Sequence, residues 1–217
     1  MLQVPKLPFQ VPEEYKEQLK EYKGYHKDIF GRAIFKTEVN EEKRYFLEKR
    51  WRIGNRVLLA CMMNPSKATH DDSDKTVDQL INKAKELNYD ALYVVNVSPK
   101  ICRRSKDLRM GDFNYDEINW VFISNSMLCS QLIFIGWGIL GQTGLKRQLK
   151  TNSSIANYFR LSINKICYYE LLVSKNKNKY VPKYYVPHPR PIFGITKYEK
   201  STFISFNSED FSKLFVY

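Results

Sequence analysis

Four apolar segments of strand length, separated by helical or polar stretches, constrain the fold of this chain more than any other feature. They are RVLLACMM, ALYVVNV, QLIFIGWG and KICYYELLV, which begin at residues 56, 91, 131 and 165. Continuous apolar runs of this length are typical of strands buried on both faces of a sheet. Because helical spacing recurs between them, as in residues 74–87, the pattern predicts a mainly parallel sheet with helices on both faces.

The predicted architecture is a single three-layer α/β/α domain at residues 32–217 with a central four-stranded, mainly parallel sheet. Residues 32–52 predict two strands that form an N-terminal β-hairpin. Residues 1–31 are expected to form an arm, in which three prolines precede a short charged helix at 13–23. Asp74 is expected to cap the first helix of the core.

The charge of the chain indicates what it binds. Its 217 residues carry 35 Lys and Arg against 23 Asp and Glu, a formal net charge of +12. Such a surplus attracts polyanions by counterion release, so DNA, single- or double-stranded, is the expected partner. A Lys-rich solvated surface encoded by an AT-rich genome accounts for the composition equally well. The expected phosphate contacts are Arg103, Arg104, Lys106, Arg109 and Arg190.

Composition and missing motifs exclude several classes of protein. A chain with 43% hydrophobic and 14% aromatic residues is not disordered as a whole. Its four cysteines form no C-x-x-C pair, and with three histidines they do not supply the short spacings of a zinc site. No dinucleotide, P-loop, zincin or serine-hydrolase fingerprint occurs. We expect no metal, no cofactor, no membrane span, and a monomer in the cytoplasm.

Polar residues stand where the predicted strands end, which is where parallel sheets bind ligands. They are Asn64-Pro65-Ser66 after the first strand, Asn96 at the end of the second, Trp137-Gly138 at the end of the third, and His188 between two prolines after the fourth. Each has an ordinary structural interpretation as well. Asn-Pro is a common turn, a tryptophan often fills a core, and an isolated histidine is usually structural.

An acidic loop follows the first strand. Asp71, Asp72 and Asp74 stand beside His70, and two carboxylates with an imidazole are able to act as a general base. A solvated loop that ends in a helix cap is the more common role of such a run, and Asp74 already fits the cap. Both interpretations remain open at this point.

Taken in order, RYFLEKRW, MMNPSKATHDDSDKTV, VVNV, IGWG and PHPRPI resemble DUF1643, a family of uncharacterised bacterial and phage proteins. The resemblance covers roughly residues 44–195. The N-P-S-x-A segment, the asparagine after the second strand and the W-G pair are distinctive together. Near the end, the family pattern G-x-P-x-H-P-L differs from this chain, where Arg190 follows Pro187-His188-Pro189.

That family is in turn similar to the uracil-DNA glycosylase superfamily, through three short motifs in the same order. MMNPSKA stands where mismatch-specific glycosylases carry G-I-N-P-G, so Asn64 matches the asparagine that positions the attacking water, and Ser66 replaces the second glycine. IGWG corresponds to a strand that ends in L-L-W-G. HPRPI corresponds to H-P-S-P-L, so His188 matches the residue that stabilises O2 of the leaving base.

The resemblance implies a glycosylase-like fold and a hydrolase that flips an unusual or modified base out of DNA and cleaves its N-glycosidic bond. Asn64 and His188 are the expected catalytic residues, with Asp72 or Asp74 supplying basicity. The expected substrate contacts are Pro65, Ser66, Asn96, Trp137 and Gly138. Two other hypotheses remain: a non-catalytic nucleic-acid-binding protein of the same fold, and an enzyme that processes free nucleosides or nucleotides.

Overall fold

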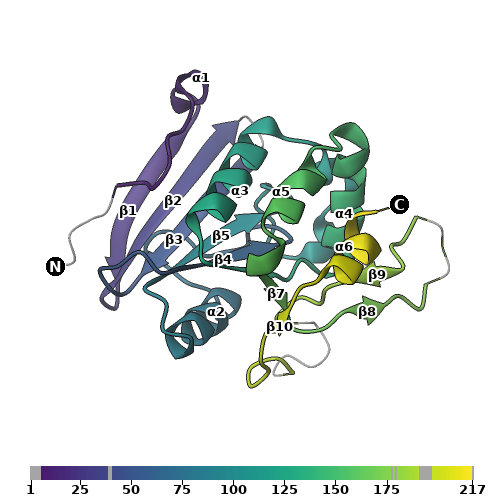
Figure 1. Ribbon diagram of the computed structural model, residues 1–217. Coiled ribbons are helices and arrows are strands. Elements are labelled where there is room, and N and C mark those ends of the chain that lie inside the picture. Colours follow the sequence, from purple (N-terminus) through teal and green to yellow (C-terminus); the bar gives the residue numbers. More distant parts are fainter. Residues whose placement is uncertain (1–5, 39–40, 177, 179, 191–196, 217) are drawn as a thin grey trace.

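The centre of the molecule is an eight-stranded mixed sheet in the order β1-β2-β3-β5-β4-β6-β7-β10 (Figure 1). The computed structural model describes residues 6–38, 41–176, 178, 180–190 and 197–216. Its four central strands are parallel: β5 (Ala91–Asn96), β4 (Val57–Met62), β6 (Leu132–Ile135) and β7 (Ile166–Tyr168). The expected α/β fold with a parallel core is therefore confirmed, but the expectation of a four-stranded sheet is wrong, because four more strands extend it.

The extension on one side consists of β1 (Lys20–His26), β2 (Ile29–Glu38) and β3 (Glu41–Arg50). The predicted hairpin is present as β2 and β3, and β3 pairs antiparallel with β5, so the hairpin is part of the main sheet. The helix predicted at 13–23 is wrong beyond the short α1 (Glu13–Lys16). Residues 20–26 pair with β2 as an edge strand, because tertiary pairing overrides the local helix-like charge pattern.

The predicted fourth strand is divided in the structure. Its first part is β7, and its last residues form β8 (Leu172–Val173), which pairs with β9 (Tyr184–Tyr185) in a separate two-stranded sheet. β10 (Ile204–Ser205) lies antiparallel to β7 and ends the main sheet on that side. The chain after β7 therefore leaves the sheet, which allows the segment around His188 to reach the carboxyl ends of the central strands.

Helices cover both faces of the sheet, as Figure 1 shows. α2 (Lys75–Glu86) packs on one face. The other face carries α3 (Glu117–Cys129), α4 (Gly138–Thr151), α5 (Ile155–Leu161) and α6 (Ser208–Phe215). Three short 3₁₀ helices complete the described elements: η1 (Ser105–Asp107), η2 (Met110–Phe113) and η3 (Ile163–Lys165).

The order of the central strands creates a crevice at the end of β4. The chain runs from β4 through α2 to β5 on one side, then crosses through α3 to β6 on the other side. Right-handed crossovers in opposite directions place α2 and α3 on opposite faces of the sheet. The connections that follow β4 and β5 therefore leave the sheet on opposite faces, which opens a crevice at the carboxyl end of β4. Ligands of open α/β sheets bind in such crevices.

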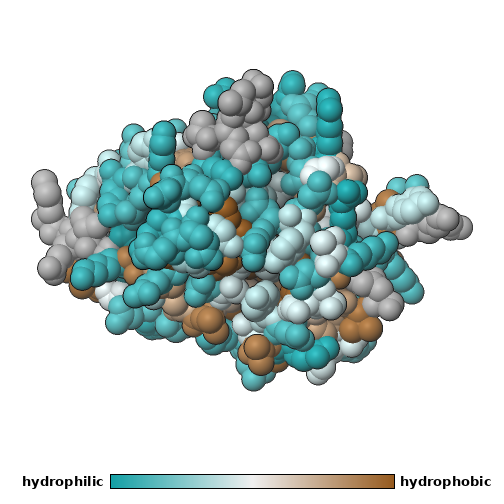
Figure 2. Space-filling model, turned by 90° about the horizontal axis from the view of Figure 1, so that it is seen from above, coloured by the Kyte–Doolittle hydropathy of each residue, from teal (hydrophilic) through white to brown (hydrophobic). Residues whose placement is uncertain are grey.

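The surface of the protein is mainly hydrophilic on the face that Figure 2 shows. On the face shown in Figure 2, hydrophilic side chains predominate, and the hydrophobic ones form small, separate groups. In the described part of the chain, no helix has both the length and the apolar character that a membrane crossing requires.

Candidate active site

A cavity of about 390 Å³ opens at the carboxyl ends of the central strands. It lies where the ends of β4 and β5, the turn after β6, the start of α2 and the segment at His188 meet. Nine of the residues predicted for the site line it: Asn64, Ser66, Asp74, Asn96, Arg103, Trp137, Gly138, His188 and Arg190. The prediction that the polar residues at the strand ends share one cleft therefore agrees with the structure.

The side chain of Asn64 is fixed through its amide nitrogen, which leaves its amide oxygen able to accept a hydrogen bond. Its Nδ2 donates to the carbonyls of Pro65 at 2.7 Å and Cys102 at 2.9 Å. Because both neighbours are acceptors, the amide nitrogen must face them, which fixes the orientation of the side chain. Among the described residues, none donates a hydrogen bond to Oδ1. Asn64 can therefore offer a fixed acceptor to a water or a ligand in the cavity.

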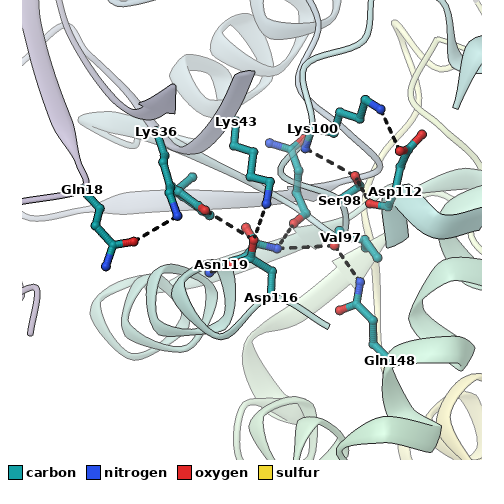
Figure 3. Close-up of polar contacts among 12 residues, drawn as sticks. Gln18, Lys36, Lys43, Val97, Ser98, Lys100, Asp112, Asp116, Asn119 and Gln148 are labelled. Carbon is teal, nitrogen blue, oxygen red and sulfur yellow. Dashed lines mark hydrogen bonds and ion pairs between the residues drawn. The ribbon is translucent and has the colours of Figure 1, made fainter. Parts of the chain in front are cut away.

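Asn96 places an unsatisfied amide in the inner part of the cavity. Its side chain is 1% exposed, and neither Oδ1 nor Nδ2 has a hydrogen-bond partner in the described protein. The backbone beside it is fixed, because Asn119 Nδ2 donates to the carbonyl of Asn96 at 2.9 Å. Figure 3 shows Gln148, whose Nε2 donates to the carbonyl of Val97 at 2.9 Å. A rigid donor–acceptor pair of this kind suits a ligand edge that carries both a carbonyl and an N–H group.

His188 lies against the turn that follows β6. Gly138 adopts a left-handed backbone with φ of +68°, which favours glycine, and a Cβ added to it would make an ordinary contact of 3.8 Å with the His188 Cβ. His188 Nδ1 lies 3.1 Å from both the backbone N–H and the carbonyl oxygen of Arg190, so it accepts from the N–H in one neutral tautomer and donates to the carbonyl in the other. Burial holds the pKa of His188 below its ordinary value. The imidazole is therefore neutral at pH 7, and the tautomer that accepts from the Arg190 N–H carries its proton on Nε2.

Acidification is expected to destabilise the protein through His188. A histidine whose folded pKa lies below 6.5, its ordinary value, binds a proton more readily in the unfolded chain, so stability falls as the pH drops below 6.5. Urea unfolding of the wild type and of His188→Gln at pH 7.5 and 5.5 measures this contribution. We expect a larger acid-induced loss in the wild type, and equal losses in both proteins would contradict the assignment.

Asp74 serves as the cap of α2, as predicted. Its Oδ1 accepts from the backbone N–H groups of Thr76 at 2.9 Å and Val77 at 3.0 Å. Its Oδ2 accepts from the hydroxyl of Ser66 at 2.5 Å. The cap thus joins the start of α2 to the loop after β4, and it brings one carboxylate to the wall of the cavity.

Replacement of Asp74 by alanine is expected to lower the free energy of unfolding by about 1–2 kcal/mol, because two backbone N–H groups lose their acceptor. The matched control is Asp71→Ala, since Asp71 is an exposed carboxylate of the same loop that accepts from Thr69. Urea denaturation curves give both values, and equal stabilities of the two variants would show that the cap contributes nothing.

Five predicted residues do not line the cavity. Asp72 belongs to the outer side of the loop, where its backbone carbonyl accepts from Lys49 Nζ at 2.8 Å, so its expected catalytic role is not supported by its position. Pro65 lies beneath Asn64 as an acceptor for the Asn64 amide. The remaining three are exposed surface residues in or near η1, namely Arg104, Lys106 and Arg109. Arg104 forms an ion pair with Asp107.

Trp137 borders the cavity, but its side chain belongs to the core. It is fully buried, and its Nε1 donates to Gln142 Oε1 at 2.7 Å. Phe159 and Phe215 contact the ring edge-to-face, with centroids at 5.7 and 6.3 Å. The position of the ring therefore does not support the expected role of Trp137 as a substrate contact, and it agrees with the interpretation as a core tryptophan.

Arg44 is the cavity residue that sequence reasoning missed. Regular alternation would place Arg44 on the same face of the sheet as Phe46 and Glu48. A bulge in β3 shifts the register, so that Arg44 pairs with Phe35 while Phe46 pairs with Ile34. Tyr45 is the extra residue. The bulge turns Arg44 to the α2 side, where its Nη1 donates to the carbonyl of Ala68 and the side chain is only 3% exposed. Burial lowers its pKa to about 10.

Within the described residues, no three His, Cys, Asp or Glu side chains converge in a way that would hold a metal ion. Residues 44–179 match the model of a protein family described as "Protein of unknown function (DUF1643)". No curated protein matches the chain. Pro191 and Ile192, the last residues of the HPRPI segment, lie outside the described residues.

Proposed function

The chain belongs to the DUF1643 family, and we propose that it hydrolyses the N-glycosidic bond of an unusual or modified base in DNA. The observation that carries the proposal is the convergence of three polar side chains, Asn64, Asn96 and His188, on one cavity at the switch point of the sheet. The cavity, at about 390 Å³, is within the size range of small-ligand sites. It therefore suits a single extruded nucleotide and not a length of duplex.

Each of the three residues has a separate task in this proposal. Asn96 pairs with the edge of the extruded base through its free amide groups. Asn64 Oδ1 accepts a hydrogen bond from the attacking water, which directs a lone pair of that water toward C1′ of the sugar. His188 donates its Nε2 proton as a hydrogen bond to the base while negative charge develops there.

The reaction is balanced by these groups. Water forms a bond to C1′ as the bond from C1′ to the base nitrogen breaks, and the bonding electrons leave with the base. Among the described residues, Asp74 supplies the carboxylate in the lining of the cavity. In this proposal it stabilises the positive charge that develops on the sugar. The proton released by the attacking water passes toward Asp74, whose Oδ2 already accepts from Ser66.

DNA binding in this proposal depends on cations around the mouth of the cavity. Arg103 lines the cavity and is exposed, and Arg104 follows it on the surface. Since Arg104 is paired with Asp107 at 2.6 Å, we assign Arg103 the larger contribution.

Replacement of Arg103 and Arg104 together by alanine is expected to weaken DNA binding for all sequences and to reduce the slope of log affinity against log salt by about 1–2. Lys85→Ala provides a control, because Lys85 is a residue of α2 that lies over the ring of Trp51 and does not line the cavity. Fluorescence anisotropy between 50 and 200 mM salt, roughly the range over which phosphate contacts are lost, measures both quantities. An unchanged slope in the double variant would contradict the assignment.

An enzyme that acts on free nucleotides is the second candidate. It is favoured by the buried cation Arg44, which lies too deep in the cavity to contact a duplex backbone. The two candidates differ in their response to DNA. Abasic-site formation in modified duplexes supports the first, and turnover of monomeric nucleotides without action on duplexes supports the second.

A further inference from the structure

We propose that Arg44 forms an anion-binding subsite in the inner wall of the cavity, so that the ligand carries a negatively charged oxygen group, a carboxylate or a phosphate, at its buried end. This inference rests on the proposed function only in treating the cavity as a ligand site. It adds the chemical class of the ligand, and it assigns a specificity-determining role to a residue outside the strand-end motifs.

Arg44 differs from the two other buried arginines of the same hairpin. Arg32 pairs with Glu21 at 2.9 Å and Glu48 at 3.4 Å, and Arg50 pairs with Glu48 at 2.8 Å. Arg44 is 3% exposed, yet it forms no ion pair with a carboxylate of the described chain, and its Nε has no hydrogen-bond partner there. A buried charge without a partner is costly to keep, so a counter-ion from outside the chain is the expected partner.

The carboxylate of the cavity does not fill that role. The charge of Asp74 raises the pKa of Arg44, but among the described residues its carboxylate forms no ion pair with the guanidinium and instead accepts hydrogen bonds from the start of α2 and from Ser66. The lining also contains Arg103 and Arg190, and Arg190 lies 3.7 Å from Glu199. The cavity therefore holds more positive than negative charge, and a concave site with low-dielectric walls focuses such a field on an anionic ligand.

The position of Arg44 limits the origin of the anion. Arg44 itself is 3% exposed, and the apolar lining residues Met62, Leu80 and Val94 are each at most 4% exposed, so Arg44 belongs to the buried part of the lining. A phosphate of a duplex backbone would remain at the mouth near the exposed Arg103. The group that reaches Arg44 therefore belongs to the nucleotide inside the cavity, either as a carboxylate on its base or as the phosphate of a free mononucleotide. A guanidinium fork binds both in the same geometry.

Isothermal titration calorimetry with two matched pairs of probes tests the proposal and separates the two sources. The first pair is a single-stranded oligonucleotide with one 5-carboxyuracil and the same strand with uracil. The second pair is deoxyuridine monophosphate and deoxyuridine. In the wild type, we expect the anionic member of at least one pair to bind at least about tenfold more tightly than its neutral counterpart. A preference within the first pair assigns the charge to the base, and a preference within the second assigns it to a free nucleotide.

Variants of β3 then show whether Arg44 is the cause. Arg44→Gln is expected to lose the preference for the anionic probe. Arg44→Lys keeps the positive charge without the paired N–H donors of the guanidinium, so it should retain only part of that preference. Arg50→Gln is the matched control, since it removes a buried arginine from the other face of the same strand and should retain the full preference. If Arg44→Gln does not fold, the comparison of Arg44→Lys with Arg50→Gln still decides the question. No preference in the wild type, or an undiminished one in the Arg44 variants, would overturn the proposal. These are binding measurements, so a failure to excise any base would defeat the proposed function and leave this result standing.

Discussion

Abasic-site formation by Asn64→Ala and by His188→Ala is expected to be about 10²- to 10⁴-fold slower than by the wild type. Asn64 loses the acceptor that orients the attacking water, and His188 loses the donor that meets the developing charge on the leaving base. Both residues border the cavity without filling the hydrophobic core. Single-turnover kinetics with excess enzyme isolates the chemical step from DNA binding and from product release.

The controls for these two variants follow from their contacts. Asn64→Ala also frees two backbone carbonyls, so its free energy of unfolding is expected to fall by about 1–2 kcal/mol, and the assay must be run well below its unfolding temperature. Asn157→Ala, which replaces an exposed asparagine on α5, should excise at the wild-type rate. Wild-type rates in Asn64→Ala and His188→Ala would show that these residues take no part in catalysis.

Asn96→Leu is expected to combine nearly unchanged stability with at least about 10²-fold weaker selection of the correct base. The amide of Asn96 has no protein partner, so its removal breaks no hydrogen bond of the folded chain, and the free energy of unfolding should stay within about 1 kcal/mol of the wild type. Recognition should suffer far more, because a site built to hydrogen-bond a substrate edge discriminates by orders of magnitude.

Two measurements check the Asn96 prediction. Chemical denaturation gives the stability, and the ratio of single-turnover rates on the preferred base and on an unmodified pyrimidine gives the selectivity. Asn119→Leu serves as the contrast, since Asn119 donates to the carbonyls of Asn96 and Val97 and its loss should destabilise the fold. A strongly destabilised Asn96→Leu with unchanged selectivity would mean that Asn96 is a structural residue.

The part of the site that the sequence predicts is the part governed by strand order. Asn64 and Asn96 could be found because each stands at the end of a long apolar run, and the carboxyl ends of parallel strands meet at one edge of a sheet. His188 could be found through its two flanking prolines and the H-P motif, since the chain leaves the main sheet before it reaches this residue. Asp74 could be found because its spacing to the first helical residues fits a cap.

The errors have local physical causes. Arg44 was missed because one extra residue in β3 reverses the faces of the strand, and no residue type marks this bulge. Asp72 was included because it stands two positions from Asp74, but the intervening turn directs the two carboxylates to different sides of the loop. The helix predicted at 13–23 overlaps the start of β1, because the charges of residues 20–23 continue a helical pattern although these residues pair with β2.

The most direct test of the glycosylase proposal is a single-turnover assay on a panel of duplexes that each carry one modified base. Enzyme and duplex are incubated at low salt, and abasic sites are detected as strand breaks after alkaline treatment. The account predicts that at least one base yields abasic sites, and that the rate falls by about 10²-fold or more in Asn64→Ala. Duplexes that bind to the wild-type protein but remain intact for every base in the panel would contradict it.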